Sequence, residues 1–499
     1  MVFSSNIFIF GFIPIFFSLY FLSPFRFKNG LILIFSLLFY AYGAGPIAVV
    51  LVLSIVVNYA GALALARVDG SAKRWMFIAL LALNIGALAY YKYFGFLWDI
   101  ADELTLGYLS SVGATRPNVL LPIGISFFTF QALSYVADVY TGHCRPCPKL
   151  VDFGMYHAMF PQLIAGPIVR YTEIESQVTR RTVSAEWVAE GAMRFIVGLA
   201  KKVIIADNAG VVADAIFGLD GSQLTASVAW LGAIAYAVQI LFDFAGYSDM
   251  AIGMAKAMGF VYPENFNHPY QSTSIIEFWH RWHMTLSRFF MSYVYNPILV
   301  RAVRRRAARG LPVSQKALAD PIPFLTLLAW PTLFTMALVG VWHGAAWKFV
   351  FFGVLNGCYL VANHVWRIMH VKLGWKHEKS TLPGRLISWA LTFAAVLAGF
   401  IVFRSPDLAS AAHFIATMAG LIEPATAEFV PINFLPNNRL TFLIVGLVIA
   451  LLPLQWAKDL FVRLPGSFLV ARAAALAVFV YSALLMAEGT FNPFIYFRF

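Results

Sequence analysis

The sequence predicts an all-α protein that crosses a membrane many times, and two observations carry this prediction. Of the 499 residues, 60% are hydrophobic and only 12% are charged, with a mean hydropathy of +0.75. A soluble protein of this length would need a far more polar surface to cover its core. Apolar runs of about twenty residues also recur from one end of the chain to the other, and a helix of that length crosses the hydrocarbon layer of a bilayer.

Candidate membrane helices follow the apolar stretches near residues 6–24, 31–43, 46–66, 75–95, 120–140, 152–168, 187–216, 225–259, 274–299, 322–340, 347–369, 386–404, 438–456 and 467–487. Because some are too short or too polar to cross, we expect roughly eleven to thirteen true spans, together with short re-entrant or interfacial helices. The segment 405–421 has charges at its start and small apolar residues after them, so we expect it along the membrane surface. No internal repeat and no soluble region is visible, and we expect residues 1–499 to form one membrane domain.

We expect the first apolar run to be a retained span rather than a cleaved leader. No Lys or Arg precedes it, it continues to about residue 22, and Arg26 and Lys28 follow it. A secretory signal would begin with positive charge and end at a small-residue cleavage site. The uncharged start and positive exit favour an N-terminus outside the cytoplasm.

The net charge of +12 lies mainly in short connections between apolar runs. The basic residues of two such connections are Arg67, Lys73 and Arg74, and Arg301, Arg304, Arg305, Arg306 and Arg309. This pattern is typical of cytoplasmic loops beside anionic lipid and argues against nucleic-acid binding.

Several kinds of chemistry lack their usual residues. Cys144 and Cys147 form a single Cys-x-x-Cys motif, and the sequence has no second such motif. Metal or redox chemistry is therefore not expected there. Glu277 and His280 have the spacing of half a di-iron site, but the sequence holds no second copy. A phosphate-binding loop of the Walker type and the nucleophile elbow of serine hydrolases are also missing. We expect no bound metal.

The densest polar cluster within apolar surroundings consists of Glu277, Phe278, Trp279, His280, Arg281, Trp282 and His283. Polar and ionisable groups at membrane depth are costly and usually mark a function or a satisfied network. On one helix, Glu277, His280 and Arg281 would share a face, and Trp279, Trp282 and His283 would lean towards another. The alternative is a membrane-surface helix with its charges in water.

A second cluster runs through Gly340, Val341, Trp342, His343 and Gly344, after a strongly apolar run. A histidine this deep either makes a structural hydrogen bond or lines a polar cavity. Imidazole suits acyl transfer because its unperturbed pKa near 6.5 lets it accept a hydroxyl proton at neutral pH. We expect the flanking glycines to let a substrate approach the backbone.

A third cluster interrupts a span with the carboxylates Asp243 and Asp249, between which Tyr247 and Ser248 lie. The carboxylates could bind cations, orient a histidine or pair with Arg281, and we favour the ion pair. In a fourth cluster, Gly166 and Pro167 predict a broken helix. Arg170 follows it and is available for a carboxylate or phosphate.

Together these motifs resemble the membrane-bound O-acyltransferase (MBOAT) family, especially its bacterial branch with the alginate O-acetylation membrane subunit. The matching segments, in family order across nearly the whole chain, are Met1–Asn6, Leu121–Phe127, Leu163–Pro167, Phe242–Gly253, Glu277–His283 and Trp342–Gly344. One such segment would be weak evidence, but six in order are strong.

The resemblance implies a ring of helices around a thin, funnel-shaped centre. It implies acetyl-CoA as a cytoplasmic donor substrate, no bound cofactor, and an acceptor on the outer side of a bacterial inner membrane. His343 would be the catalytic histidine and His283 an assisting one. The residues that would bind donor or substrate, or support the site, are Trp342, Gly344, Glu277, Trp279, His280, Arg281, Trp282, Asp243, Tyr247, Ser248, Asp249, Gly166, Pro167 and Arg170. The arginines between 301 and 309 would lie near the donor entrance and steer the phosphates of coenzyme A, with simple topology as the alternative.

In the polysaccharide branch, such a membrane protein is expected to pass acetyl to a periplasmic partner of the SGNH type, which modifies the polymer. The segment Ser287–Pro297 departs from the family pattern, because the Arg-Asp pair and glycine loop that often follow the second motif are missing. The acceptor therefore stays open among alginate, peptidoglycan, cellulose and other exopolysaccharides. From other classes of protein, a polysaccharide transporter or flippase and a non-catalytic scaffold are the alternatives.

Overall fold

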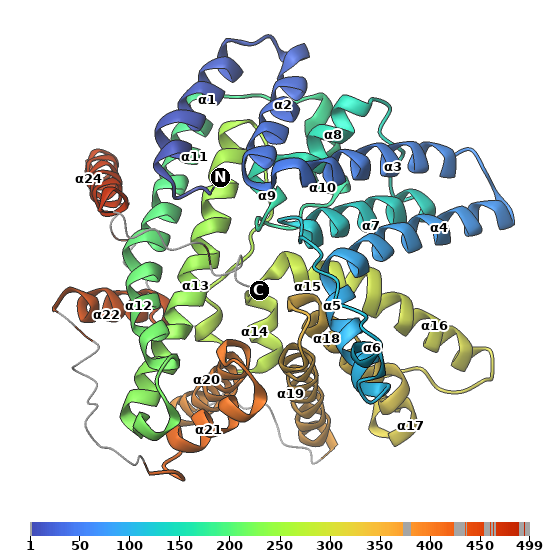
Figure 1. The fold of residues 1–499 in the computed structure, drawn as a ribbon, viewed down its shortest axis with the longest axis vertical. Coiled ribbons are helices and arrows are strands. Elements are labelled where there is room, and N and C mark those ends of the chain that lie inside the picture. The colour runs from blue at the N-terminus through green and yellow to red at the C-terminus, as the bar shows by residue number, and fades with distance from the viewer. Residues whose placement is uncertain are drawn as a thin grey trace. The chain divides into compact units, whose positions relative to one another are not determined.

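The computed structural model describes residues 2–372, 381–423, 437–453 and 466–488, together with residues 435, 460, 463 and 494. All regular structure in these residues is helical (Figure 1), which confirms the all-α prediction. Contacts divide the chain into two compact units. Unit 1 comprises residues 1–200, 246–264 and 472–499, and unit 2 comprises residues 201–245 and 265–471. The expectation of a single domain stays a prediction.

Unit 1 begins with a series of apolar helices. Its elements are η1 (Ile7–Phe12), α1 (Ile13–Leu22), α2 (Phe25–Ala44), η2 (Gly45–Ala48), α3 (Val49–Leu65), α4 (Gly70–Leu88), η3 (Ala89–Tyr93), α5 (Phe94–Leu104), α6 (Tyr108–Ser111), α7 (Ile125–Thr141), α8 (Leu150–Ala158), α9 (Phe160–Leu163), α10 (Tyr171–Thr179) and α11 (Ala185–Ala200). Helices α3, α4 and α7 lie side by side (Figure 1). The long helix α13 (Ala226–Ala257) contributes residues to both units.

Unit 2 contains both motif histidines. Its elements besides α13 are η4 (Lys201–Ala206), α12 (Asp207–Phe217), η5 (Gly221–Gln223), η6 (Pro269–Gln271), α14 (Ile275–Arg281), α15 (Met284–Phe290), η7 (Met291–Tyr295), α16 (Asn296–Ala307), η8 (Gln315–Ala319), α17 (Pro321–Phe324), η9 (Leu325–Ala329), α18 (Trp330–His343), α19 (Trp347–Lys372), α20 (Leu382–Arg404), α21 (Leu408–Met418) and α22 (Asn437–Leu451). Helix α24 (Ser467–Ala487) begins where this unit ends.

Seven helical stretches of the described residues are long and apolar enough to cross a membrane. They are Phe25–Leu65, Gly70–Leu104, Ala226–Ala257, Pro321–His343, Trp347–His370, Leu382–Arg404 and Ser467–Ala487. Shorter apolar helices cover Ile7–Leu22, Leu408–Met418 and Arg439–Leu451. The chain is thus a multi-pass membrane protein. Because Phe25–Leu65 joins α2 and α3 in one stretch and the shorter helices are counted apart, the expectation of eleven to thirteen spans stays a prediction.

Several of the expected spans are divided into shorter helices. The stretch 274–299 is broken into α14, α15, η7 and α16, and the stretch 152–168 into α8 and α9. Residues 454–456 of the expected span 438–456 lie outside the described residues. The stretch 405–421 contains one short helix, α21, whose N-terminus is capped by the Asp407 carboxylate accepting from the Ser410 N–H at 2.8 Å.

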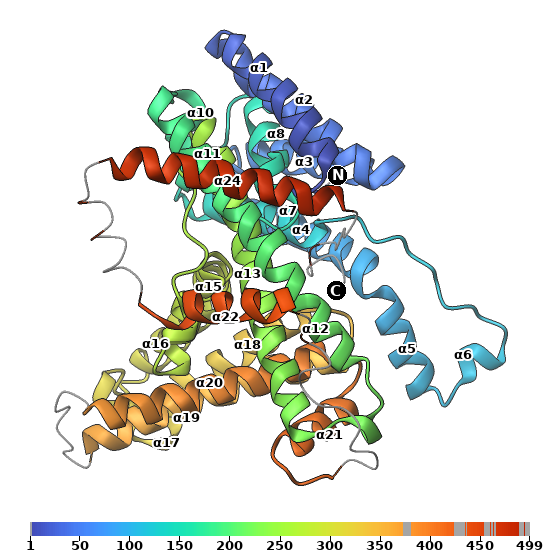
Figure 2. The same ribbon diagram turned by 90° about the vertical axis from the view of Figure 1, so that its left-hand side faces the viewer.

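The hairpin of α18 and α19 is the most closely packed helix pair of unit 2. A Cβ atom on Gly340 would lie 2.3 Å from the Phe349 carbonyl oxygen, and one on Gly353 would lie 2.3 Å from the Met336 carbonyl oxygen. The two backbones therefore touch where only glycine fits, as at many helix crossings in membranes. Helix α20 lies beside α19 (Figure 2) and closes the other side of the hairpin.

Candidate active site

The Glu277–His283 motif is a helix end and a turn, not one helix. Helix α14 begins after Ser274, whose hydroxyl oxygen accepts from the Glu277 N–H at 3.1 Å, and it ends at Arg281. Trp282 is extended, and His283 has a φ of +41° before α15 begins. The expected arrangement of six of these residues on two faces of one helix is therefore wrong, because Trp282 and His283 lie beyond the end of α14. A non-glycine residue with positive φ is uncommon and costs on the order of 1–3 kcal/mol, so surrounding contacts must hold it.

Asn265 supplies those contacts from the loop that follows α13. Its side-chain oxygen accepts from the Thr285 N–H at 3.2 Å and the Thr285 hydroxyl at 2.9 Å, and it lies 3.1 Å from His283 Nδ1. A backbone N–H can only donate, so the amide oxygen must face this way, and His283 Nδ1 must carry the proton. The Met284 N–H also donates to the Asn265 carbonyl at 2.9 Å. Asn265 thus fixes both the position and the tautomer of His283.

The other ring nitrogen of His283 is left as a bare acceptor. The side chain is 1% exposed, and Nε2 has no hydrogen-bond partner among the described residues. Phe244 packs edge-on against the ring at 4.6 Å between centroids. Burial lowers the pKa of His283 to about 3, so the ring is neutral at physiological pH. A buried acceptor without a partner is costly, which makes it a candidate for binding a substrate donor group.

His343 is the last residue of α18 and is half-buried. The edges of Phe352 and Phe403 meet its ring at centroid distances of 5.7 and 4.9 Å. Trp342 lies beside it at 4.6 Å and is also 5.9 Å from the His283 ring. The two motif histidines therefore flank the same indole, although 60 residues of sequence separate them.

The glycines of the second motif serve packing. A Cβ atom on Gly344 would lie 2.2 Å from the Phe349 ring. The space where a side chain of residue 340 would lie is occupied by the α19 backbone. The expectation that these glycines admit a substrate is wrong, because protein atoms already occupy the space. They instead let α19 hold the end of α18, and with it His343, in place.

The remaining residues of the first motif support the turn. Glu277 and Arg281 form an ion pair of 2.8 Å, half-buried on both sides, and Glu277 also accepts from the Thr273 N–H at 2.9 Å. His280 is exposed, as the membrane-surface alternative expects. Trp279 and Trp282 are buried, with 7% of each exposed.

The two carboxylates of α13 pair with basic residues other than Arg281. Asp243 accepts from Lys202 at 2.6 Å within unit 2. In unit 1, Asp249 accepts from Arg194 at 2.8 Å. Ion pairing is therefore correct, but the expected partner is wrong because Arg281 is held by Glu277. Both aspartates have structural partners.

Lys202 is the centre of a buried charge cluster and was not singled out by the sequence. It is 1% exposed and contacts Asp207 at 2.7 Å as well as Asp243. Burial alone would lower the pKa of Lys202, but the two carboxylates raise that pKa above its ordinary value. The amine is therefore a cation and serves as a buried counter-ion.

Tyr247 and Ser248 lie on the part of α13 that belongs to unit 1, and both are buried. The Tyr247 ring stacks on Phe3 at 4.5 Å and meets the Phe494 edge at 4.9 Å. Tyr247 is thus a packing residue within unit 1.

The Gly-Pro motif is a break between helices, as expected. Helix α9 ends at Leu163, and α10 begins at Tyr171. A Cβ atom on Gly166 would lie 2.5 Å from the Pro161 carbonyl oxygen, so the residue is confined to glycine by crowding. Arg170 caps α10 and forms an ion pair of 3.1 Å with Glu173. Gly166, Pro167 and Arg170 belong to unit 1 and the two histidines to unit 2.

Cys144 and Cys147 are both buried free cysteines in unit 1. Burial raises the pKa of the Cys144 thiol to about 12, so the reactive thiolate is disfavoured. Among the described residues, no three His, Cys, Asp or Glu side chains are grouped as metal ligands.

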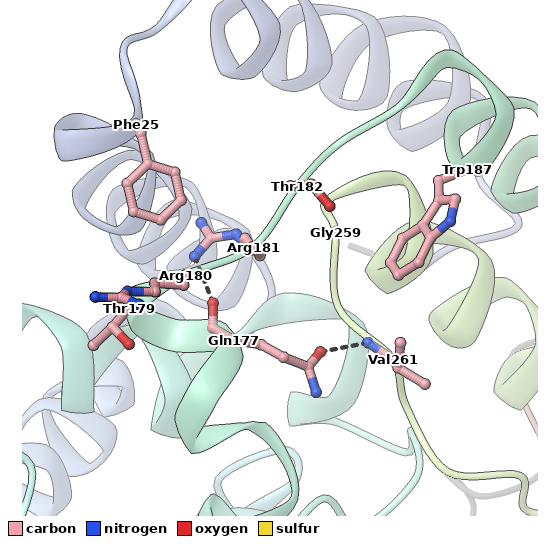
Figure 3. A pocket seen from close by; sticks show the side chains of 9 residues that line it. All are labelled: Phe25, Gln177, Thr179, Arg180, Arg181, Thr182, Trp187, Gly259 and Val261. Carbon is pink, nitrogen blue, oxygen red and sulfur yellow. Dashed lines mark hydrogen bonds between the residues drawn. The ribbon is translucent and has the colours of Figure 1, made fainter.

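A pocket of about 610 Å³ in unit 1 contains an arginine that the protein itself uses (Figure 3). Arg181 Nε donates to the Tyr20 hydroxyl and to the Met258 carbonyl, both at 3.2 Å. Its Nη1 donates to the Gln177 carbonyl at 3.3 Å, and its guanidinium stacks on Phe260 at 4.4 Å. None of the motif residues lines this pocket. Arg181 thus joins segments of unit 1.

The two histidines lie beside one indole in a chain with several membrane-crossing helices, and sequence comparison identifies the class of this protein as membrane acyltransferase. The model of the membrane-bound O-acyltransferase family matches residues 143–310. The chain is also 34% identical to a probable alginate O-acetylase AlgI of Azotobacter vinelandii, over the whole of both chains. The protein belongs to the membrane-bound O-acyltransferase family and is an O-acyltransferase.

Two further relatives show the range of acceptors within this similarity. A probable alginate O-acetylase AlgI of Pseudomonas aeruginosa is 38% identical, covering 82% of this chain and 73% of its own length. A peptidoglycan O-acetyltransferase of Helicobacter pylori is 31% identical, covering 84% and 80%.

Proposed function

We propose that the protein transfers acetyl groups from cytoplasmic acetyl-CoA to hydroxyl groups of an extracytoplasmic polysaccharide at the bacterial inner membrane. The observation that carries the proposal is the placement of both His283 and His343 beside Trp342. Named relatives acetylate alginate or peptidoglycan, and both polymers offer sugar hydroxyls. The acceptor of this chain is an alginate-like exopolysaccharide, since the AlgI relatives have the higher identities.

His343 is the general base of this reaction. Its ring takes the proton from the attacking hydroxyl, and the hydroxyl oxygen bonds to the thioester carbonyl carbon of the donor. The tetrahedral adduct then expels the coenzyme A sulfur as the carbon–sulfur bond breaks, and the proton held by His343 goes to that sulfur. The products are an acetyl ester and free coenzyme A, and His343 returns to its neutral form. The half-buried position of His343 supports this role, because a base must reach its substrate.

His283 positions the acceptor rather than taking its proton. With a pKa of about 3 it is a poor base, but its Nε2 lone pair can accept a hydrogen bond from a substrate hydroxyl. Asn265 is a positioning residue that acts through His283, because it holds Nδ1–H and so keeps Nε2 free of a proton. Losing this hydrogen bond would let the ring rotate or change tautomer.

The donor enters from the cytoplasm and the acceptor from the periplasm. The basic connections support this sidedness by the positive-inside rule, which places Arg67, Arg74 and the arginines of α16 inside and the N-terminus outside. A periplasmic SGNH-type acetyltransferase is the proposed partner that receives the acetyl group and modifies the polymer. The shared chemistry in either case is attack by a hydroxyl oxygen.

The proposal is tested with the full chain in sealed inverted membrane vesicles, whose outer face is cytoplasmic. Radiolabelled acetyl-CoA is added outside, and oligomeric alginate or peptidoglycan fragments are enclosed inside, with and without the candidate periplasmic partner. We expect label to accumulate on the enclosed alginate. Label on peptidoglycan alone would show that peptidoglycan, and not alginate, is the acceptor. Label on neither polymer, with both histidines present, would overturn the proposed function.

A further inference from the structure

A second pocket, of about 790 Å³, lies in unit 2 between α16 and the start of the span Pro321–His343. One wall carries four arginines of α16 and the residues just after it: Arg301, Arg305, Arg306 and Arg309. The opposite wall is formed by Ile322, Leu325, Thr326 and Trp330. The pocket is thus basic on one side and apolar on the other.

The arginines of this pocket are poorly compensated. Arg301, Arg305 and Arg309 are exposed and form no ion pair with a carboxylate among the described residues. Arg306 donates weakly to the Pro312 carbonyl, at 3.3 and 3.4 Å. Placement near the C-terminus of α16 favours Arg304 to Arg306 through the helix dipole, but this effect falls off within one turn. Four guanidinium groups around one pocket repel one another unless an anion lies between them.

The apolar wall is the lipid-facing stripe of a membrane span. Ile322, Leu325 and Trp330 are 69%, 58% and 56% exposed. These positions recur every three to five residues on one helical face, and Phe334 continues the stripe towards the membrane interior with 36% exposed. An apolar chain could therefore run from the pocket along the helix without leaving the hydrocarbon layer.

We propose that this pocket binds an anionic phospholipid of the cytoplasmic leaflet. The phosphate lies among the arginines of α16, where guanidinium groups give charge-assisted, two-pronged hydrogen bonds to phosphate oxygens. The acyl chain lies along the stripe from Ile322 to Trp330. Coenzyme A carries phosphates as well, but it is water-soluble and would leave a lipid-facing stripe unused. The pocket of Figure 3 differs, because there Arg181 already donates a hydrogen bond to the Gln177 carbonyl.

The test measures lipid binding to the full chain by native mass spectrometry, with phosphatidylglycerol, phosphatidylcholine and coenzyme A as separate probes. We expect phosphatidylglycerol to bind in preference to phosphatidylcholine. The variant Arg301→Gln/Arg305→Gln/Arg309→Gln should weaken phosphatidylglycerol binding at least about tenfold, because each basic residue at a membrane surface contributes roughly a fivefold factor. The Leu325→Ala/Trp330→Ala variant should weaken the long-chain lipid more than a short-chain analogue.

The matched control is Arg67→Gln/Lys73→Gln/Arg74→Gln, which removes the same charge from another basic connection and should change binding less than about twofold. If both triple variants weakened phosphatidylglycerol binding equally, the effect would be due to overall charge, and the proposed lipid site would be refuted. Binding of coenzyme A that the α16 variant abolishes, with phosphatidylglycerol binding unchanged, would assign the pocket to the donor instead. Neither readout requires acetyl transfer, so a failure here is distinct from a failure of the proposed function.

Discussion

The turn between α14 and α15 and the end of α18 each place one histidine beside Trp342, but they hold it differently. His283 is enclosed, 1% exposed, and its tautomer is fixed by Asn265. His343 is half-buried at a helix end, and aromatic edges surround its ring. The difference teaches that the two residues cannot do the same work. An enclosed neutral ring suits a fixed hydrogen-bond acceptor, whereas a ring within reach of substrates suits a base.

Of the changes to these two histidines, removing His343 should lower the rate of acetyl transfer most. We expect His343→Ala to lower the rate of acetyl transfer by about 10²–10⁴-fold, the usual contribution of a general base. Because one half-buried imidazole adds little to helix packing, membrane insertion should be unchanged. The control is His364→Ala, which removes another half-buried histidine one helix away, on α19, and should keep most activity. Near-normal turnover by purified His343→Ala protein would refute its role as the base.

Changing His283 should separate hydrogen bonding from proton transfer. His283→Asn keeps a side chain that can hydrogen-bond, although its amide reaches only the position of Nδ1, and should retain part of the activity. His283→Ala should lose more activity, by the contribution of about one hydrogen bond to the substrate. The measurement is kcat and KM for the acceptor, and the loss should include a raised KM. If His283→Asn were as inactive as His343→Ala, both histidines would take part in proton transfer.

Changes at Asn265 should act through His283 and appear in the pH profile. Asn265→Leu removes the Nδ1 partner and should lower activity several-fold at all pH values. In Asn265→Asp, a carboxylate beside Nδ1–H should raise the pKa of His283. Below that raised pKa, Nε2 carries a proton and cannot accept, so activity should fall at a higher pH than in the unchanged protein. A merely structural Asn265 would give equal losses in both variants and no shift of the acidic limb.

The smallest expected effect concerns stability. The pKa of His283 is lowered to about 3 in the folded protein, and the ordinary value is about 6.5. Above pH 6.5 both states are neutral there, and between 6.5 and 3 only the unfolded state takes up the proton. The free energy of unfolding should therefore decrease as the pH is lowered through that window, by at most about 1.4 kcal/mol per pH unit from this residue. Thermal unfolding of His283→Asn between pH 7 and 5 should show a shallower slope, and identical slopes would contradict the buried neutral ring.

Sequence alone predicted the α-helical membrane class, because hydropathy is a local property, and its short motifs singled out the two histidines that the structure places beside Trp342. It did not reach the turn at His283, whose left-handed backbone depends on Asn265 in a separate loop. The prediction that Glu277, His280 and Arg281 lie on one helix is confirmed, and that helix, α14, ends at Arg281. Gly340 and Gly344 were assigned to substrate access because no neighbouring residue in the sequence indicates that Phe349 and Gly353 occupy the space beside them. Long-range partners were the part that pattern and periodicity could not supply.

The ion pair between Lys202 and Asp243 has a consequence for how the protein is made. A lone aspartate near the centre of a helix costs roughly 3 kcal/mol when the translocon releases that helix into lipid. Lys202 precedes Asp243 by 41 residues and has therefore left the ribosome before α13 is complete. Because Lys202 is synthesised first, we expect its side chain to be available to neutralise Asp243 as α13 enters the bilayer. Helix α13 is apolar enough to cross a membrane, and we expect its pairing with Lys202 to offset the cost that Asp243 adds to its insertion.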